Sequence, residues 1–295
     1  MFDESREGFM TEISSEPTST PTADDPHTSS SSHPSNSRGP MSKLSKVGQL
    51  KRLCQHAAQL RWSNAPHQGR SRQPQYHPSS HSWIRTDDLY PAAYKFAIKA
   101  RLDLHPTNAN KQLWGQQPDG NCRRCGQRED IHHILSFCSA YMPHKTRRHD
   151  TILNRIAKSV RYNNRNHQVF INQSPPHIIA NGLRPDIVVI HEKEVIMLDV
   201  VVTSQHQPDA LHIARRRKQD KYSNLALQYQ LKGFQVTNDA IAFGDVGHND
   251  WRNYTLLRKL GTPRNAAIRL MKWCVNDTLR SGHHMWIARC TANHS

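Results

Sequence analysis

Residues 184–202, RPDIVVIHEKEVIMLDVVV, decide the fold of this chain. Two apolar, β-branched runs flank the polar tetrad HEKE, and this pattern predicts a β-hairpin. With the turn centred in the tetrad, Ile190 faces Val195 and Asp186 faces Asp199. Residues that face each other across an antiparallel pair have side chains on the same side of the sheet, about 5 Å apart. The hairpin therefore brings two carboxylates together.

The segments around this hairpin alternate between helix and strand patterns. A third β-branched run follows a long helix pattern that ends at Gly233, a residue that commonly terminates helices. The expected strands cover residues 186–190, 195–202 and 235–243, and the expected helices cover residues 87–104, 145–160, 209–232, 251–260 and 265–279. This order predicts an α/β core, a mixed sheet flanked by helices.

The two facing carboxylates predict a magnesium site. Acids this close repel each other unless a cation joins them, and Mg²⁺ prefers oxygen sites made of one or two carboxylates plus phosphate. A divalent metal that bridges a scissile phosphate also lowers the pKa of the attacking water. We therefore predict that Asp186 and Asp199 are catalytic residues and ligands of Mg²⁺ or Mn²⁺.

A metal nuclease of this kind also needs a positive group near the phosphate. The usual acid-x-lysine arrangement is absent, because Val201 occupies the lysine position. The next helix carries Lys218 and Lys221 on or beside the apolar face that packs toward the sheet. Both lysines are therefore candidates for this positive group.

Each of these residues also has a purely structural interpretation. Asp186 follows a proline at a strand start, where aspartate is common as a turn or cap residue. Asp199 lies within an apolar run and fits a core carboxylate held in an ion pair. The basic run at residues 215–218 fits a solvated helix face or a localisation signal. Only the combination of two acids with a lysine on the next helix indicates a metal nuclease.

A cysteine and histidine cluster precedes the core. Cys122, Cys125, His133 and Cys138 have the spacing C-x2-C-x7-H-x4-C, which lets three thiolates and one imidazole bind one tetrahedral Zn²⁺. The alternatives are free or buried cysteines beside a chance histidine, and His132 in place of His133 as the ligand. A closed site of this kind has no open coordination position, so we expect its zinc to be structural.

The charge of the chain predicts a nucleic-acid partner. Its 295 residues include 40 Lys and Arg against 24 Asp and Glu, which gives a formal net charge of +16 and favours a polyanion over a membrane. No run of about 18 apolar residues and no secretion signal is present, so we expect a soluble intracellular protein with no membrane partner. The residues expected to contact nucleic acid are Arg123, Arg124, Arg128, Arg148 and Arg184.

Composition divides the chain into five expected segments. Residues 11–40 are rich in Ser, Thr and Pro and contain few apolar side chains, so they cannot offset the entropy of ordering a backbone. The segments are a disordered tail at 1–45, a basic and mostly helical segment at 46–115, a small Cys3His zinc knuckle at 116–144, the α/β domain at 145–282 and a C-terminal tail at 283–295.

The order of these motifs resembles the C-terminal region of non-long-terminal-repeat (non-LTR) retrotransposon polyproteins that carry a restriction-like endonuclease and insert site-specifically into ribosomal DNA. The likeness covers roughly residues 82–262, including residues 97–107, AIKARLDLHPT, which resemble the stretch before the knuckle in that family. The motifs are, in chain order, the knuckle, Arg148-His149-Asp150, Arg184-Pro185-Asp186, Asp199 and Lys218-Gln219-Asp220-Lys221-Tyr222.

The resemblance implies a restriction-endonuclease-like fold of PD-(D/E)XK type with a displaced lysine. Such an enzyme nicks target DNA, and the exposed 3′ end primes reverse transcription. Carried over to this sequence, Asp186 and Asp199 are the metal-binding acids, and His149 is a supporting residue. Lys218 or Lys221 is the catalytic lysine, and we prefer Lys218 because Lys221 and Tyr222 can serve to pack the helix. A nuclear location follows, with target DNA and element RNA as partners.

One departure from the family is large. The family's full polypeptide contains a reverse transcriptase with a hydrophobic-x-Asp-Asp motif, whereas Asp24-Asp25 lies in the expected tail and Asp87-Asp88 follows no apolar strand. We therefore expect no polymerase activity, and a truncated element copy, a gene fragment or a domesticated remnant each fit the sequence. The rival function is a protein whose knuckle and basic surface bind DNA or RNA while its nuclease site is silent.

Overall fold

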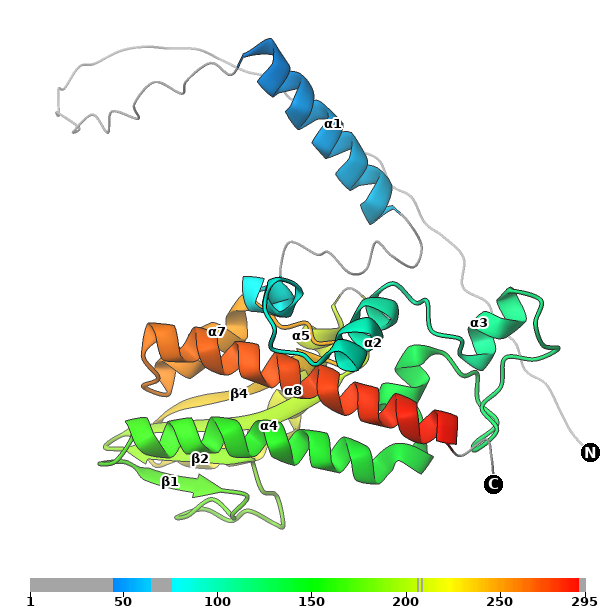
Figure 1. The fold of residues 1–295 in the computed structure, drawn as a ribbon. Helices are drawn as coiled ribbons and strands as arrows, with labels where there is room; N and C mark the ends of the chain where they lie inside the picture. Colours follow the sequence, from blue (N-terminus) through cyan, green and yellow to red (C-terminus); the bar gives the residue numbers. More distant parts are fainter. Residues whose placement is uncertain (1–44, 65–75, 206, 208, 292–295) are drawn as a thin grey trace, which may run out of the picture. The chain divides into compact units, whose positions relative to one another are not determined.

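A mixed four-stranded sheet forms the centre of the described structure. The computed structural model describes residues 45–64, 76–205, 207 and 209–291, so the expected disordered tail lies, except for residue 45, outside the described residues. Within these ranges, four strands pair in the order β1-β2-β3-β4 (Figure 1). The strands are β1 (Gln168–Ile171), β2 (Ile187–His191), β3 (Glu194–Thr203) and β4 (Gln235–Gly244).

The first three strands pair antiparallel, whereas β3 and β4 are parallel. A parallel pair needs a crossover connection, and α5 (Ala210–Lys221) with α6 (Ser223–Leu231) supplies it. The other helical elements are α1 (Lys46–Ser63), η2 (Pro78–Arg85), α2 (Pro91–Arg101), α3 (Asn108–Leu113), η3 (His133–Phe137), η4 (Ser139–Tyr141), α4 (Met142–Asn163), α7 (Trp251–Lys259) and α8 (Arg264–Thr291). Among the described residues, every helix is too short or too polar to cross a bilayer.

The predicted hairpin register is confirmed. Val188 pairs with Met197 and Ile190 pairs with Val195 across β2 and β3. Both faces of these strands are buried, which explains why their sequence is a continuous apolar run without alternating polar residues. The register determines which side chains share a face, so it also determines the position of the two acids.

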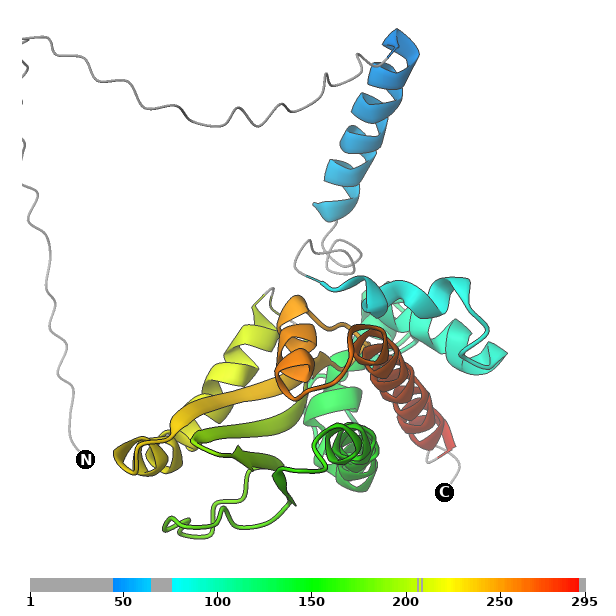
Figure 2. The same cartoon turned by 90° about the vertical axis from the view of Figure 1, so that its left-hand side faces the viewer.

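Helices cover both faces of the sheet (Figures 1 and 2). One face packs against α4, α7 and α8, and the opposite face packs against α6 and the residue before it. The first face contributes Ile187, Val189, Ile196, Leu198, Val200, Ile241 and Phe243, and the second contributes Val188, Ile190, Val195 and Met197 against Tyr222, Leu225 and Tyr229. The prediction of a mixed sheet flanked by helices is confirmed.

The C-terminal helix is longer than the sequence pattern predicts. It continues past residue 279 to Thr291, so most of the expected tail at 283–295 is helical. Met285 of this extension is fully buried and packs in one cluster with Cys122 and Cys138. Arg289 forms a buried ion pair with Glu129, 2.7 Å from Nη2 to Oε1. These contacts with the cysteine segment stabilise the extra turns, and they form only in the tertiary structure.

Three further elements differ from the expectation. The helix expected at 209–232 is divided at Tyr222 into α5 and α6, and the helix expected at 87–104 is shorter, because it begins at Pro91. Strand β1 was not expected, because its four residues are too few to produce a clear alternating pattern. The α4, α7 and β4 bounds lie within a few residues of those expected.

Candidate active site and cysteine cluster

The hairpin places two acids at the end of β2. Asp186 precedes β2, Asp199 lies within β3, and both side chains are nearly buried. The backbone N–H of Asp186 donates to Oδ1 of Asp199 over 3.1 Å, and the backbone N–H of Val200 donates to Oδ2 of Asp186 over 2.7 Å. Each carboxylate is therefore fixed by the backbone of the other acid's strand, as the predicted register requires.

The two candidate lysines have different partners. Lys218 of α5 donates to Oδ2 of Asp199. Lys221 instead donates to the hydroxyl of Tyr222 over 2.9 Å, and its ammonium lies 4.7 Å from the centre of the Tyr222 ring. The structure thus places Lys218 against Asp199, whereas the partner of Lys221 is Tyr222.

Tyr222 is a site residue whose role the sequence did not reveal. Its hydroxyl lies 3.1 Å from both Oδ1 of Asp199 and the carbonyl oxygen of Arg184. Burial raises the pKa of Tyr222, and the neighbouring Asp199 raises it further, so the hydroxyl stays protonated and can donate. The signal in the sequence was its position four residues after Lys218, which puts both side chains on one side of the helical segment.

His149 of α4 reaches the same site from the other side. Its Nε2 lies 3.0 Å from Oδ2 of Asp186, and its Nδ1 lies 3.1 Å from Oδ1 of Asp150. The hydrogen bond to Asp186 raises the pKa of His149 to about 9, against the opposing effect of burial, and Asp150 adds to the rise. At neutral pH the imidazole is therefore a cation.

The donor set of this site suits a hard divalent cation. Two carboxylates on one side of a hairpin are the oxygen ligands that Mg²⁺ and Mn²⁺ prefer. Lys218 and His149 both direct positive charge at these carboxylates. These two cations balance the charge of the carboxylates, and the four groups come from the residue before β2 and from β3, α5 and α4.

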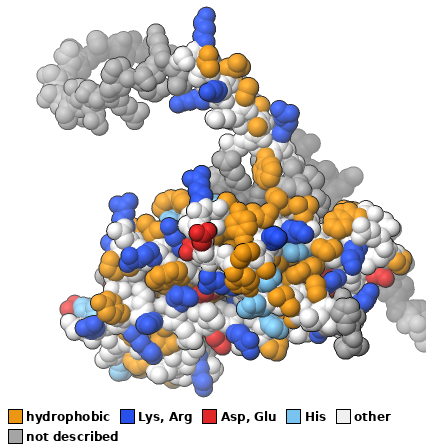
Figure 3. Space-filling model, viewed as in Figure 1, with side chains coloured by type: hydrophobic (Ala, Val, Ile, Leu, Met, Phe, Trp, Pro, Cys, Tyr) orange, Lys and Arg blue, Asp and Glu red, His pale blue; other side chains and the backbone are white. Residues whose placement is uncertain are grey.

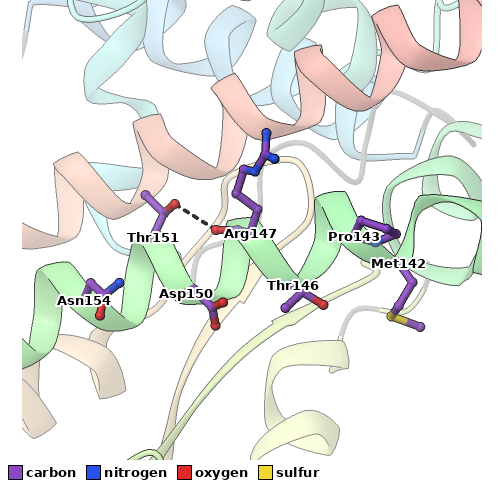
Figure 4. A pocket seen from close by; sticks show the side chains of 7 residues that line it. All are labelled: Met142, Pro143, Thr146, Arg147, Asp150, Thr151 and Asn154. Carbon is purple, nitrogen blue, oxygen red and sulfur yellow. Dashed lines mark hydrogen bonds between the residues drawn. The ribbon is translucent and has the colours of Figure 1, made fainter.

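An open hollow lies along α4 (Figure 4). It has a volume of about 680 Å³. Asp150, the hydrogen-bond partner of His149, is among its lining residues, whereas Asp186 and Asp199 are not. Thr146 and Asp150 point to one side of the helix, and Arg147 points to the other. The hollow is lined by Met142, Pro143, Thr146, Arg147, Asp150, Thr151 and Asn154.

The four predicted zinc ligands converge. The ligand atoms of Cys122, Cys125, His133 and Cys138 all lie within 4.8 Å of one another. The sulfurs of Cys122 and Cys138 are 3.9 Å apart, and those of Cys125 and Cys138 are 4.0 Å apart. Bonds of about 2.3 Å from one tetrahedral zinc place two sulfurs about 3.8 Å apart, so the cluster has the dimensions of a zinc site.

The protonation states of this cluster also fit a metal. Burial lowers the pKa of His133, which keeps its imidazole neutral and able to ligate. Burial raises the pKa of Cys122 to about 12 in the protein alone, so a bound cation is what would stabilise its thiolate. His132 does not join the cluster: its Nδ1 lies 2.9 Å from Asp245, so the alternative in which it replaces His133 is wrong.

The arginines predicted to contact nucleic acid divide into two groups. Arg123, Arg124, Arg128 and Arg184 are exposed, and Arg124 lies over the ring of Tyr141 at 5.2 Å. Arg148 is only 3% exposed, because it lies on the inward face of α4. The expectation of a surface contact through Arg148 is therefore corrected.

No protein-family model matches the chain. A match among curated proteins is the "Retrovirus-related Pol polyprotein from type-2 retrotransposable element R2DM" of Drosophila melanogaster, 26% identical over 178 residues. The matched segment covers 58% of this chain and 16% of that protein, so the chain spans only about a sixth of its curated relative. This distant similarity supports a non-LTR retrotransposon origin and agrees with the resemblance seen in the motifs.

Proposed function

We propose that this chain is a metal-dependent DNA endonuclease of the restriction-like, non-LTR retrotransposon type, which nicks one strand of its target. The observation that carries the proposal is the convergence of Asp186, Asp199, Lys218 and His149 from four separate elements. Acids and cations that far apart in sequence meet in one place only because the fold brings them there. The curated relative supports the retroelement context.

In this proposal, Asp186 and Asp199 would hold Mg²⁺ or Mn²⁺, and the bound ion would supply activation of water and stabilisation of charge on the scissile phosphate. Tyr222 and the backbone N–H groups orient the two acids. Lys218 offsets the negative charge that develops on the phosphate as the water oxygen bonds to phosphorus and the bond to the 3′ oxygen breaks. The protonated imidazole of His149 helps to fix Asp186.

The exposed arginines and the cysteine cluster belong to nucleic-acid binding in this proposal. A structural Zn²⁺ holds the knuckle, which presents Arg123, Arg124 and Arg128 to phosphates, and Arg184 lies beside the acids. Figure 3 shows Lys and Arg side chains spread over the face that carries α4 and α8. The partners are target DNA and the element's RNA, and the site of action is the nucleus.

A plasmid-nicking assay with Mg²⁺ or Mn²⁺ tests the endonuclease. We expect the purified chain to convert supercoiled plasmid to the nicked form, and we expect Asp186→Asn, Asp199→Asn and Lys218→Ala each to lower the rate at least 100-fold, since each removes a charge from the site. Lys221→Ala is the matched control and should keep most of the activity. An inactive protein that still binds DNA would instead establish the rival, a silent nucleic-acid-binding remnant.

The salt dependence of binding tests the basic surface separately from the chemistry. Neutralising each phosphate of duplex DNA contributes about −0.9 to the slope of log K against log salt. We expect a steep slope that becomes shallower by about that amount for each of Arg123→Ala and Arg124→Ala. Binding should persist in Asp186→Ala and Asp199→Ala, and a flat salt response would argue for a protein partner.

A further inference from the structure

A second pocket lies away from the carboxylates, where η2, α7 and α8 meet. It has a volume of about 460 Å³, within the range of small-molecule sites, and it shares no residue with the site around Asp186 and Asp199. Residues of α7 and α8 line it, and these helices pack on the face of the sheet opposite the face that α6 covers. The residues that line it are His77, Pro78, Ser79, Ser82, Trp251, Tyr254, Arg264, Ile268 and Lys272.

Three aromatic rings form one wall of this pocket. The His77 ring meets the edge of Trp251 at 4.3 Å between centroids and stacks on Tyr254 at 5.9 Å. Trp251 is 52% exposed, so part of its indole ring is accessible to a ligand from solvent. Through the exposed Trp251, these rings offer an aromatic surface on which a ligand can stack.

The aromatic wall is rigid before any ligand arrives. Asp250 caps α7 by accepting the backbone N–H groups of Arg252 and Asn253, and it also receives Arg215. The imidazole Nδ1 of His77 accepts the backbone N–H of Ser79 over 3.1 Å. These bonds fix the backbone beside Trp251 and the orientation of the imidazole, so little conformational entropy is lost on binding.

The part of the pocket that α8 contributes is basic. Arg264, Ile268 and Lys272 lie four residues apart on α8, so one face of that helix presents two cations separated by an apolar side chain. Among the described residues that line the pocket, none is acidic. Aromatic rings and two cations in one pocket complement a ligand with a flat ring and adjacent negative charges.

We infer that this pocket binds a nucleotide of a single-stranded nucleic acid, with the base stacked on Trp251 and Tyr254 and the flanking phosphates on Arg264 and Lys272. Duplex DNA does not fit this arrangement, because its bases are already stacked within the helix. Base stacking on aromatic side chains with a basic groove along the backbone is the general chemistry by which proteins bind single strands. The inference does not depend on nuclease activity.

Fluorescence anisotropy with labelled 15-mers of oligo(dT) and oligo(rU), without added Mg²⁺ or Mn²⁺, tests the pocket in the full zinc-loaded chain. We expect Trp251→Ala to weaken binding roughly tenfold or more, and Trp251→Phe to retain most of the affinity because it keeps a ring. Arg264→Ala and Lys272→Ala should each reduce the salt slope by about 0.7, the value for single strands. The two oligonucleotides show whether the strand is DNA, RNA or either.

Matched controls lie on the same helix outside the pocket. Trp273→Ala removes a similarly exposed tryptophan, and Arg269→Ala removes an exposed arginine, and both should bind like the unchanged chain. Equal affinities for Trp251→Ala and Trp273→Ala would overturn the inference, as would a pocket variant that affects duplex binding alone.

Photocross-linking gives a second readout that does not depend on a variant. Oligonucleotides with 5-iodouracil should cross-link to peptides that contain Trp251 or Tyr254, and cross-links confined to other peptides would contradict the inference. Asp199→Asn should bind and cross-link normally. Failure of the nicking assay with normal cross-linking would therefore reject the endonuclease and leave the pocket intact.

Discussion

The cysteine cluster and the carboxylate site differ in whether their groups already have a positively charged partner. The cluster gathers three thiols and an imidazole from residues 122–138, and these groups lie within hydrogen-bonding distance of one another. The carboxylate site gathers two acids that are each already bonded to a cation, Lys218 or His149. From this difference we expect the cluster to depend on a bound ion for its folding and the carboxylate site to fold without one.

The largest expected effect is the loss of zinc from the cluster. Binding of structural zinc contributes on the order of 10 kcal/mol, so Cys138→Ser or a zinc chelator should unfold residues 116–144. Because Cys138 shares a core with Met285, the last turns of α8 should lose amide protection too. Native mass spectrometry should detect one zinc in the unchanged chain and none in the variant.

Cys54→Ser is the matched control, since Cys54 is exposed in α1 and lies outside the cluster. It should bind zinc and melt like the unchanged chain. A knuckle that keeps its amide protection without metal would remove the contrast between the two regions.

The second effect concerns the carboxylate site. Asp199→Ala leaves the backbone N–H of Asp186 and Lys218 without this acceptor and removes one of the two acceptors of the Tyr222 hydroxyl, and we expect it to lower the free energy of unfolding by about 3 to 4 kcal/mol. Urea titration monitored by circular dichroism measures this. The region should keep its hydrogen-exchange protection in the presence of a Mg²⁺ chelator, and a cooperative loss there would show that it also depends on a metal.

The third effect is a pH dependence beside the cysteine cluster. His105 lies under Trp286 and Phe96, and its Nε2 bonds to the carbonyl oxygen of Phe96 over 3.1 Å. Burial lowers the pKa of His105 to about 4, and the nearby positive groups Lys99, His283 and Arg289 lower it as well. The folded protein therefore holds this imidazole neutral in a pH range where the unfolded chain binds a proton.

The sign follows from that difference. The stabilisation is complete above pH 6.5 and is lost as the pH falls toward 4, by no more than about 3 kcal/mol. His105→Gln cannot titrate, so its free energy of unfolding should fall less than that of the unchanged chain between pH 7 and pH 4.5. Equal losses in the two proteins, with zinc bound in both, would show that His105 does not titrate in this range.

The smallest expected effect is that of removing the Tyr222 hydroxyl. Tyr222→Phe keeps the ring in the core and removes the hydroxyl that lies between Asp199 and the Arg184 carbonyl. We expect about 1 kcal/mol of lost stability, and a lower nicking rate with unchanged DNA affinity. Tyr229→Phe is the control, because its hydroxyl bonds to the Pro176 carbonyl instead. A Tyr222→Phe protein with full activity would show that the hydroxyl does not orient Asp199.

Much of the hairpin and of the cysteine cluster was predictable, because both depend on short separations along the chain. The register of β2 and β3 follows from a two-residue turn between apolar runs, and it places Asp186 opposite Asp199. The spacing of the Cys3His residues likewise brought the expected four side chains together. In both regions the chain is too short between the residues concerned to permit many other arrangements.

The same reasoning does not predict which distant elements a helical residue meets, as Arg148, Lys218 and Lys221 show. Helical periodicity put both lysines near the sheet, but only the break at Tyr222 and the packing of α5 decided that Lys218 reaches Asp199. Arg148 was among the residues expected to contact nucleic acid, whereas the inward face of α4 buries it. Periodicity defines a face of a helix, and the neighbouring elements decide what that face meets.

The sequence by itself determined the hairpin, its pair of acids, the ligands of the cysteine cluster and the excess of positive charge. Only the tertiary structure showed which acid Lys218 and His149 each contact, how far α8 extends, and that Trp251 and Arg264 line one pocket. The physical reason is the range of the interactions. Local geometry limits residues that are close in sequence, whereas residues separated by tens of positions meet only through the packing of whole helices and strands.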